Sequence, residues 1–308
     1  METLNAILQY LAIAGATTLK QLAWLFGLLF IFGFLLYLLA RFTRTSYVKT
    51  IGSRFDIVFT GWIGTPVHEL GHAIFCILFR HKIVEIKLFA PNSEDGTLGY
   101  VKHSYDTSSI YQKVGNFFIG IGPILFGTIV LYALLYFLVP NSETIFNYIR
   151  TQSQTLAGST HGEFNGVPVT LWETSKHIFA SLFSASNFSD YRFWIFLYAS
   201  ICVASHMELS PPDIKGAWKG LLILVLVFLF INLIIIGTET LGYHQHLGKW
   251  WQYIKLESYT SAIDNFVGIS GALFVFASIV SGINFLFSYI LLTIINLVRK
   301  KGFVNPAW

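Results

Sequence analysis

Long runs of apolar residues, separated by polar stretches, dominate the pattern of hydrophobic and polar positions along the chain. The segment 22–40 contains no charged residue and is long enough to cross the hydrocarbon core of a bilayer as an α-helix. Further apolar segments cover residues 57–79, 114–139, 193–207, 221–237 and 267–297. In the third of these six segments, Gly122 and Pro123 permit tight packing and a kink. The pattern predicts an all-α polytopic membrane protein with about six transmembrane helices.

The remaining segments are expected to lie outside the bilayer core. Residues 4–16 are apolar but too short to span, which suggests an interfacial or packed helix. Residues 140–192 form the longest polar stretch, which is expected to be an extramembrane loop with a helical piece near residues 171–183 on the membrane surface. His161 and Glu163 in this loop are more simply explained as solvated side chains than as ligands. The chain divides into an N-terminal anchor region (1–56), a core (57–220) and C-terminal transmembrane helices (221–308).

An alternating pattern directly after the second apolar segment predicts a β-hairpin. Apolar residues at 84, 86 and 88 alternate with charged residues at 85 and 87, which is the period of a strand. Residues 92–96 have the composition of a turn, and residues 97–102 are predicted to form the return strand. The edge of such a hairpin could pair with an extended peptide by β-augmentation, although an ordinary loop hairpin explains the pattern equally well.

Composition places most of the chain in a lipid bilayer. Apolar residues make up 54% and charged residues 12% of the chain, and the mean hydropathy is +0.61. A water-soluble domain would not tolerate so much apolar surface. The net charge of +4 is spread over the loops, so we expect no nucleic-acid partner. Cys76 and Cys202 fall in apolar segments, where packing is their simplest role.

The expected location is a membrane that the chain crosses several times. The compact architecture suits an integral protein of a bacterial cytoplasmic membrane, with the lipid bilayer as one of its partners. The sequence leaves the oligomeric state open.

The sequence His68-Glu69-Leu70-Gly71-His72 in the second apolar segment is the strongest candidate for chemistry. On an α-helix, His68 and His72 lie one turn apart on one face, so their imidazoles can bind one metal ion. Zn²⁺ in such a site keeps a water molecule in an open position, and the adjacent Glu69 can take its proton. Ionisable groups in a membrane segment are costly, which favours a functional reason for their presence. The pattern predicts a zinc site for peptide-bond hydrolysis.

A second candidate segment, residues 205–216, contains two tandem prolines. Prolines interrupt a helix, and irregular backbone at membrane depth is tolerated where it lines a wet cavity. Asp213 could be a third, anionic metal ligand, or it could cap the next helix together with Ser210, and spacing alone leaves both roles open. His206 and Glu208 are competing ligand candidates. The side chain of His206 could instead hydrogen-bond the substrate carbonyl.

Together these elements resemble the site-2 protease family of intramembrane zinc metalloproteases. The resemblance covers roughly residues 61–220 and rests on the His-Glu-Leu-Gly-His-Ala motif at 68–73, the strand 96–102, Gly122-Pro123 and Pro212-Asp213. It implies that His68, His72 and Asp213 hold Zn²⁺. It also implies that Glu69 is catalytic and that the hairpin binds substrate beside the metal. The family's second motif usually reads Leu-Asp-Gly after an upstream Asn-Pro, whereas here Pro212 precedes the aspartate and the next glycine comes three residues later.

We therefore expect an intramembrane zinc endopeptidase that hydrolyses peptide bonds in or near the transmembrane segments of other membrane proteins. One alternative is a membrane protease in which Glu208 or Glu239 replaces Asp213 as the third zinc ligand. Another is a non-proteolytic zinc-binding scaffold or transporter subunit. The family's topology would place the basic segment 41–54, expected to be a loop, on the outer side of the membrane, against the positive-inside tendency.

Overall fold

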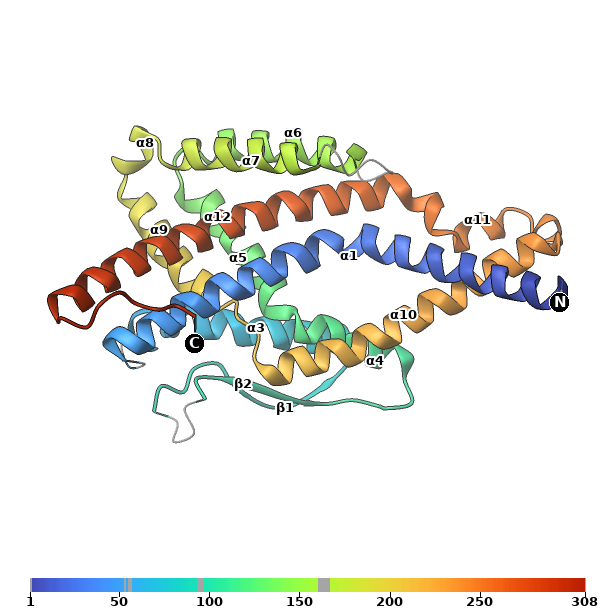
Figure 1. The fold of residues 1–308 in the computed structure, drawn as a ribbon, viewed down its shortest axis with the longest axis horizontal. Coiled ribbons are helices and arrows are strands. Elements are labelled where there is room, and N and C mark those ends of the chain that lie inside the picture. The colour runs from blue at the N-terminus through green and yellow to red at the C-terminus, as the bar shows by residue number, and fades with distance from the viewer. Residues whose placement is uncertain (1, 53, 55–56, 93–96, 160–166, 308) are drawn as a thin grey trace.

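The computed structural model describes residues 2–52, 54, 57–92, 97–159 and 167–307, and most of them are helical (Figure 1). His161, Glu163 and most of the expected hairpin turn lie outside the described residues. The helices are α1 (Glu2–Ile51), α3 (Trp62–Leu78), α4 (Ile110–Gly120), α5 (Gly122–Leu138), α6 (Ser142–Ser159), α7 (Val167–Leu182), α8 (Ala185–Phe188), α9 (Tyr191–Ser205), α10 (Pro211–Thr240), α11 (Trp250–Ile254) and α12 (Thr260–Val298). The strands β1 (Lys82–Lys87) and β2 (Tyr100–Ser104) form one small sheet. The expected all-α membrane-type architecture with one hairpin is confirmed.

Three helices in the described part of the chain are long and apolar enough to cross a membrane, namely α1, α10 and α12. Helices α4 and α5 are bent by 56° and add a fourth if the pair is one broken span. This bend lies next to Gly122 and Pro123, the residues whose composition permits a kink. The expected spans 57–79 and 193–207 correspond to α3 and α9, which have only 17 and 15 residues. Helix length and composition therefore do not show the expected six spans.

The first helix, α1, differs most from the expectation. Residues 4–16, expected as a separate short helix, and most of the basic segment 41–54, expected as a loop, belong to one helix of 50 residues. No proline interrupts it, and it packs along α12 and α10 (Figure 1). Trp24 Nε1 donates a hydrogen bond to Asp264 Oδ1 on α12 at 3.0 Å. Contacts with distant helices therefore support a continuous helix where the local pattern suggests separate pieces.

The polar stretch 140–192 is a second correction, because most of it is helical. Helices α6 and α7 run side by side, and both pack on α12 (Figure 1). Ile145 on α6 and both Ile178 and Leu182 on α7 are almost fully buried in the largest apolar cluster. Widely spaced apolar residues can bury one face of a helix even where the sequence is polar on average. The helical piece expected near 171–183 falls within α7.

Strands β1 and β2 pair antiparallel directly after α3, as expected. Glu85 lies opposite Lys102, and Ile86 lies opposite Val101. The Tyr100 hydroxyl and the Lys102 ammonium both donate to the Glu85 carboxylate, which keeps the pKa of this exposed group below its usual value. The hairpin lies below α3 and the start of α10 in Figure 1, which brings it next to the histidine motif.

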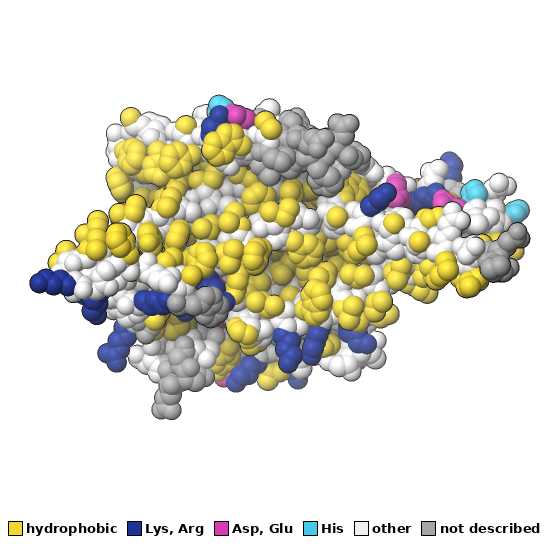
Figure 2. Space-filling model, in the orientation of Figure 1, with side chains coloured by type: hydrophobic (Ala, Val, Ile, Leu, Met, Phe, Trp, Pro, Cys, Tyr) yellow, Lys and Arg dark blue, Asp and Glu magenta, His cyan; other side chains and the backbone are white. Residues whose placement is uncertain are grey.

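The outer surface is strongly apolar. Figure 2 shows hydrophobic side chains across the middle of the visible face, with Lys and Arg side chains along its lower edge. Phe34, Phe230 and Phe287 are 62%, 64% and 60% exposed. In membrane proteins, surface of this kind is covered by lipid, because its exposure to water is unfavourable.

Candidate metal site

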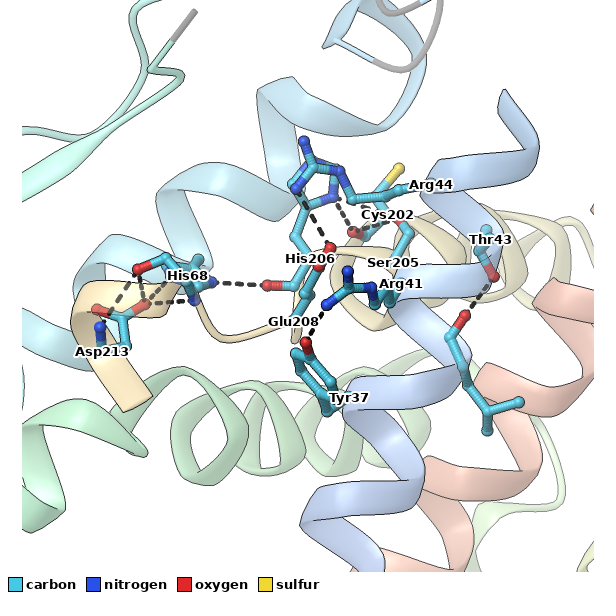
Figure 3. Close-up of polar contacts among 12 residues, drawn as sticks. Tyr37, Arg41, Thr43, Arg44, His68, Cys202, Ser205, His206, Glu208 and Asp213 are labelled. Atoms are coloured by element: carbon cyan, nitrogen blue, oxygen red, sulfur yellow. Dashed lines mark hydrogen bonds and ion pairs between the residues drawn. The ribbon is translucent and has the colours of Figure 1, made fainter. Parts of the chain in front are cut away.

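Helix α3 carries the two motif histidines, and α10 brings Asp213 against them. Figure 3 shows His68 and Asp213 side by side. His68 Nε2 and His72 Nε2 are 3.2 Å apart. Asp213 Oδ1 is 3.3 Å from His72 Nε2, and Asp213 Oδ2 is 3.8 Å from His68 Nε2. These ligand atoms lie within 4.8 Å of one another, and they form the one such group found among the described residues.

The spacing fits a metal ion held by two imidazole nitrogens and one carboxylate oxygen. Ligand atoms bound to a tetrahedral ion at about 2.0–2.2 Å are separated from one another by about 3.3 Å. The three separations here, 3.2, 3.3 and 3.8 Å, are close to that value. The group could therefore hold a metal ion. Two imidazoles and a carboxylate suit Zn²⁺ and other first-row metals alike, so the donor set does not identify the element.

Backbone carbonyls orient both imidazoles. His68 Nδ1 donates to the carbonyl oxygen of His206, and His72 Nδ1 donates to the carbonyl oxygen of Ile119, each at 2.7 Å. A proton on Nδ1 defines the neutral tautomer in which Nε2 carries a lone pair. Both lone pairs are thereby directed toward the space beside Asp213, as in metal sites whose histidines are held by outer hydrogen bonds.

Asp213 is both a helix cap and a member of this group. The N–H and the hydroxyl of Ser210 donate to Asp213 Oδ2 at 2.8 and 2.6 Å. The Asp213 N–H donates in return to Ser210 Oγ, which completes a capping box. A carboxylate has enough lone pairs to accept these bonds and still present oxygen to a cation. The two roles that spacing alone left open are therefore compatible.

Glycines allow the helices to approach closely enough to form the site. A Cβ on Gly120, at the end of α4, would lie 2.5 Å from the backbone oxygen of Asp213 and 2.7 Å from Ala217 Cβ. A Cβ on Gly71 would lie 2.7 Å from the backbone oxygen of Gly122. Since close-packed interiors do not accommodate such overlaps, glycine at these positions lets α4 contact α10 and α3 contact α5 directly.

Substituting Gly120 by alanine should push α10 away from α4 and displace Asp213. We expect Gly120→Ala to lower the free energy of unfolding by about 1–3 kcal/mol and to weaken metal binding. The matched control is Gly216→Ala on α10, where a Cβ meets nothing within 4 Å and alanine favours the helix. Thermal unfolding in detergent and metal titration measure both effects. Equal behaviour of the two variants would show that the contact at Gly120 does not position Asp213.

Glu69 lies beside the metal-binding group and is only 6% exposed. It lines a cavity of about 420 Å³ together with His68, His72 and Asp213. Gly99, just before β2, brings the hairpin against it, because a Cβ there would lie 2.8 Å from Glu69 Cγ. A carboxylate placed beside two imidazoles and a cavity can accept a proton from a small molecule in that cavity.

His206 takes part in the site through its backbone carbonyl, which accepts the hydrogen bond from His68 (Figure 3). Its ring Nδ1 lies 3.1 Å from the carbonyl oxygen of Cys202 and 3.2 Å from Ser205 Oγ. The residue therefore orients a member of the metal-binding group. A role for its side chain in substrate positioning stays a prediction.

The two glutamates considered as third ligands are paired with cations and do not belong to the metal-binding group. Glu208 forms an ion pair with Arg44 on α1 at 3.5 Å. Glu239, near the C-terminal end of α10, pairs with Lys255. In the described structure, Asp213 is thus the carboxylate that accompanies the two histidines.

Two kinds of contribution to this region are absent from the sequence-based prediction. One is the pair of backbone carbonyls of His206 and Ile119, which carry no side-chain signal. The other is the pair Arg41 and Arg44, which faces the site from α1 (Figure 3). Tyr37, Arg41 and Arg44 have the spacing of one helix face. This spacing could have pointed to the two arginines only if the helix had been expected to continue past residue 40.

The site therefore combines side chains from α3 and α10 with carbonyls from α4 and from the linker 206–210. This arrangement is compatible with metal binding and with proton transfer at Glu69. Comparison of the chain with protein-family models gave no match, and comparisons with curated proteins and with solved structures gave none either.

Proposed function

We propose that this chain is an intramembrane zinc endopeptidase, as its resemblance to the site-2 protease family implies. The observation that carries the proposal is the convergence of Glu69 with His68, His72 and Asp213 on one cavity. A carboxylate base beside three protein ligands is typical of hydrolytic zinc sites, in which a further coordination position stays open.

Each residue has a defined part in the proposed hydrolysis. A zinc ion bound here would supply Lewis-acid activation of a water molecule and of the scissile carbonyl. Glu69 takes a proton from the attacking water and then delivers it to the departing amide nitrogen, so the peptide bond is replaced by a carboxylate and an amine. The carbonyls of His206 and Ile119 hold the two imidazoles in the required tautomer.

The proposed substrate is a transmembrane segment of another protein in the same bilayer. Carbonyls in an intact helix are already hydrogen-bonded, so the segment must unwind locally before a peptide bond reaches Glu69. The hairpin near Gly99 lies against Glu69 and could pair with the unwound segment in extended form. Residues that weaken helices should therefore favour cleavage.

In this proposal the chain crosses a bacterial cytoplasmic membrane about six times, with α3 and α9 as short crossings. Helix α3 packs against α4, α5 and α9. A helix packed against several others need not match the full thickness of the bilayer, because its ends can meet a water-filled cavity. The same cavity would admit the water that hydrolysis requires.

Removing the metal should stop cleavage, and zinc should restore it. The full chain in detergent is incubated with synthetic transmembrane peptides that carry helix-weakening Asn, Gly or Pro residues. We expect the chelator 1,10-phenanthroline to abolish product formation and about one equivalent of Zn²⁺ to restore it. Cleavage by metal-free protein would reject metal-dependent hydrolysis. Bound zinc without cleavage of any peptide, together with normal cellular function of Glu69→Gln, would favour a scaffold or transporter subunit.

A further inference from the structure

The C-terminal part of α1 meets the proposed active site across a second, larger cavity. Tyr37, Arg41 and Arg44 follow the spacing of one helix face and line this cavity, which measures about 610 Å³. His68 and Glu69 line the same cavity. One open space therefore extends from the proposed catalytic residue to α1.

The wall that α1 provides is positively charged. Arg41, Arg44 and Lys49 line the cavity, and Arg44 forms its ion pair with Glu208 there (Figure 3). Arg41 hydrogen-bonds the Tyr37 hydroxyl. Lys49 Nζ donates to two backbone carbonyl oxygens of the C-terminal segment, at 3.1 and 3.3 Å. The three cations lie together on the side of the cavity that α1 forms, and Glu69 and Glu208 line it as well.

We propose that Arg41, with Arg44 and Lys49, binds a carboxylate of the substrate peptide, the side chain of an Asp or Glu a few residues from the cleaved bond. The inference rests on the proposed function. A peptide whose scissile bond lies at Glu69 continues into the cavity that these cations line, which favours a peptide over a lipid headgroup as the occupant. A guanidinium presents a fork of N–H donors that matches a carboxylate. An acidic side chain at membrane depth requires such a partner.

The test uses a peptide that the wild-type chain cleaves, in which residues within about four positions of the cleaved bond are replaced one at a time by Glu or Gln. We expect Glu at one position to raise kcat/KM about tenfold over Gln, mainly through a lower KM, as one charge-assisted hydrogen-bonded pair can provide. Arg41→Gln should bring the Glu-to-Gln ratio to about one. Lys215→Gln is the control, because Lys215 is exposed on α10 and does not line the cavity; it should keep the preference.

Binding measurements separate a failure of this inference from a failure of the proposed function. Glu69→Gln protein is titrated with fluorescent Glu and Gln transmembrane peptides in micelles that contain phosphatidylglycerol or phosphatidylcholine. The inference is supported if the Glu peptide binds about tenfold more tightly than the Gln peptide and if the added substitution Arg41→Gln removes this difference. This result would support the inference even if no peptide is cleaved. In that case only the proposed proteolytic function fails. Equal binding and cleavage of Glu and Gln peptides would overturn the inference. Competition by phosphatidylglycerol with no Glu preference would assign the cations to a lipid phosphate and overturn it too.

Discussion

Replacing Glu69 by glutamine should abolish cleavage while the protein keeps its metal. Glutamine has nearly the same size and fits the buried space beside Gly99, but it cannot take a proton from water at neutral pH. Loss of a general base lowers the rate by about 10²–10⁴-fold. Product formation from transmembrane peptides and zinc content by mass spectrometry measure the two properties on the same preparation.

The control for this substitution is Glu239→Gln, which makes the same chemical change near the far end of α10, where Glu239 pairs with Lys255. It should cleave at the wild-type rate. If Glu69→Gln also cleaves at that rate, Glu69 has no part in the mechanism. If Glu69→Gln loses zinc, the residue is needed for the metal site itself, and the division of roles proposed for the motif is wrong.

Removing the carboxylate of Asp213 should release the metal. Asparagine keeps the shape of the side chain and an oxygen that can accept from Ser210, so much of the capping box can persist in Asp213→Asn. The anionic ligand is lost, however. Substitutions that only alter the surroundings of metal ligands already cost about 10–100-fold in affinity, so we expect a loss of more than about 100-fold here. Zinc titration against a competing chelator measures it.

Two comparisons show whether such a loss comes from the ligand or from the fold. Ser210→Ala removes the cap at a cost of about 1 kcal/mol in the free energy of unfolding, but it leaves the Asp213 carboxylate in place and should retain zinc. Glu208→Gln should retain zinc as well, because Glu208 pairs with Arg44. Full zinc retention in Asp213→Asn with loss in Glu208→Gln or Glu239→Gln would identify one of those glutamates as the third ligand.

Local patterns predicted the helices and the hairpin well where neighbouring residues decide the conformation. Apolar runs within the described helices α10 and α12 are long and uncharged, and the alternation around Glu85 shows the period of a strand. The same reasoning failed for 140–192, because the average polarity of a segment hides a narrow apolar face. Ile178 and Leu182, four residues apart, bury that face of α7.

The sequence by itself determined the membrane character of the chain and the placement of two histidines one turn apart with a glutamate next to the first, since both follow from apolar run length and helical period. Only the tertiary structure decided that Asp213 accompanies the histidines, that the carbonyls of His206 and Ile119 orient them, and that α1 continues far enough to line a cavity beside them. These features depend on contacts between helices far apart in the chain. Local spacing and composition do not encode such contacts, because close packing between helices selects them.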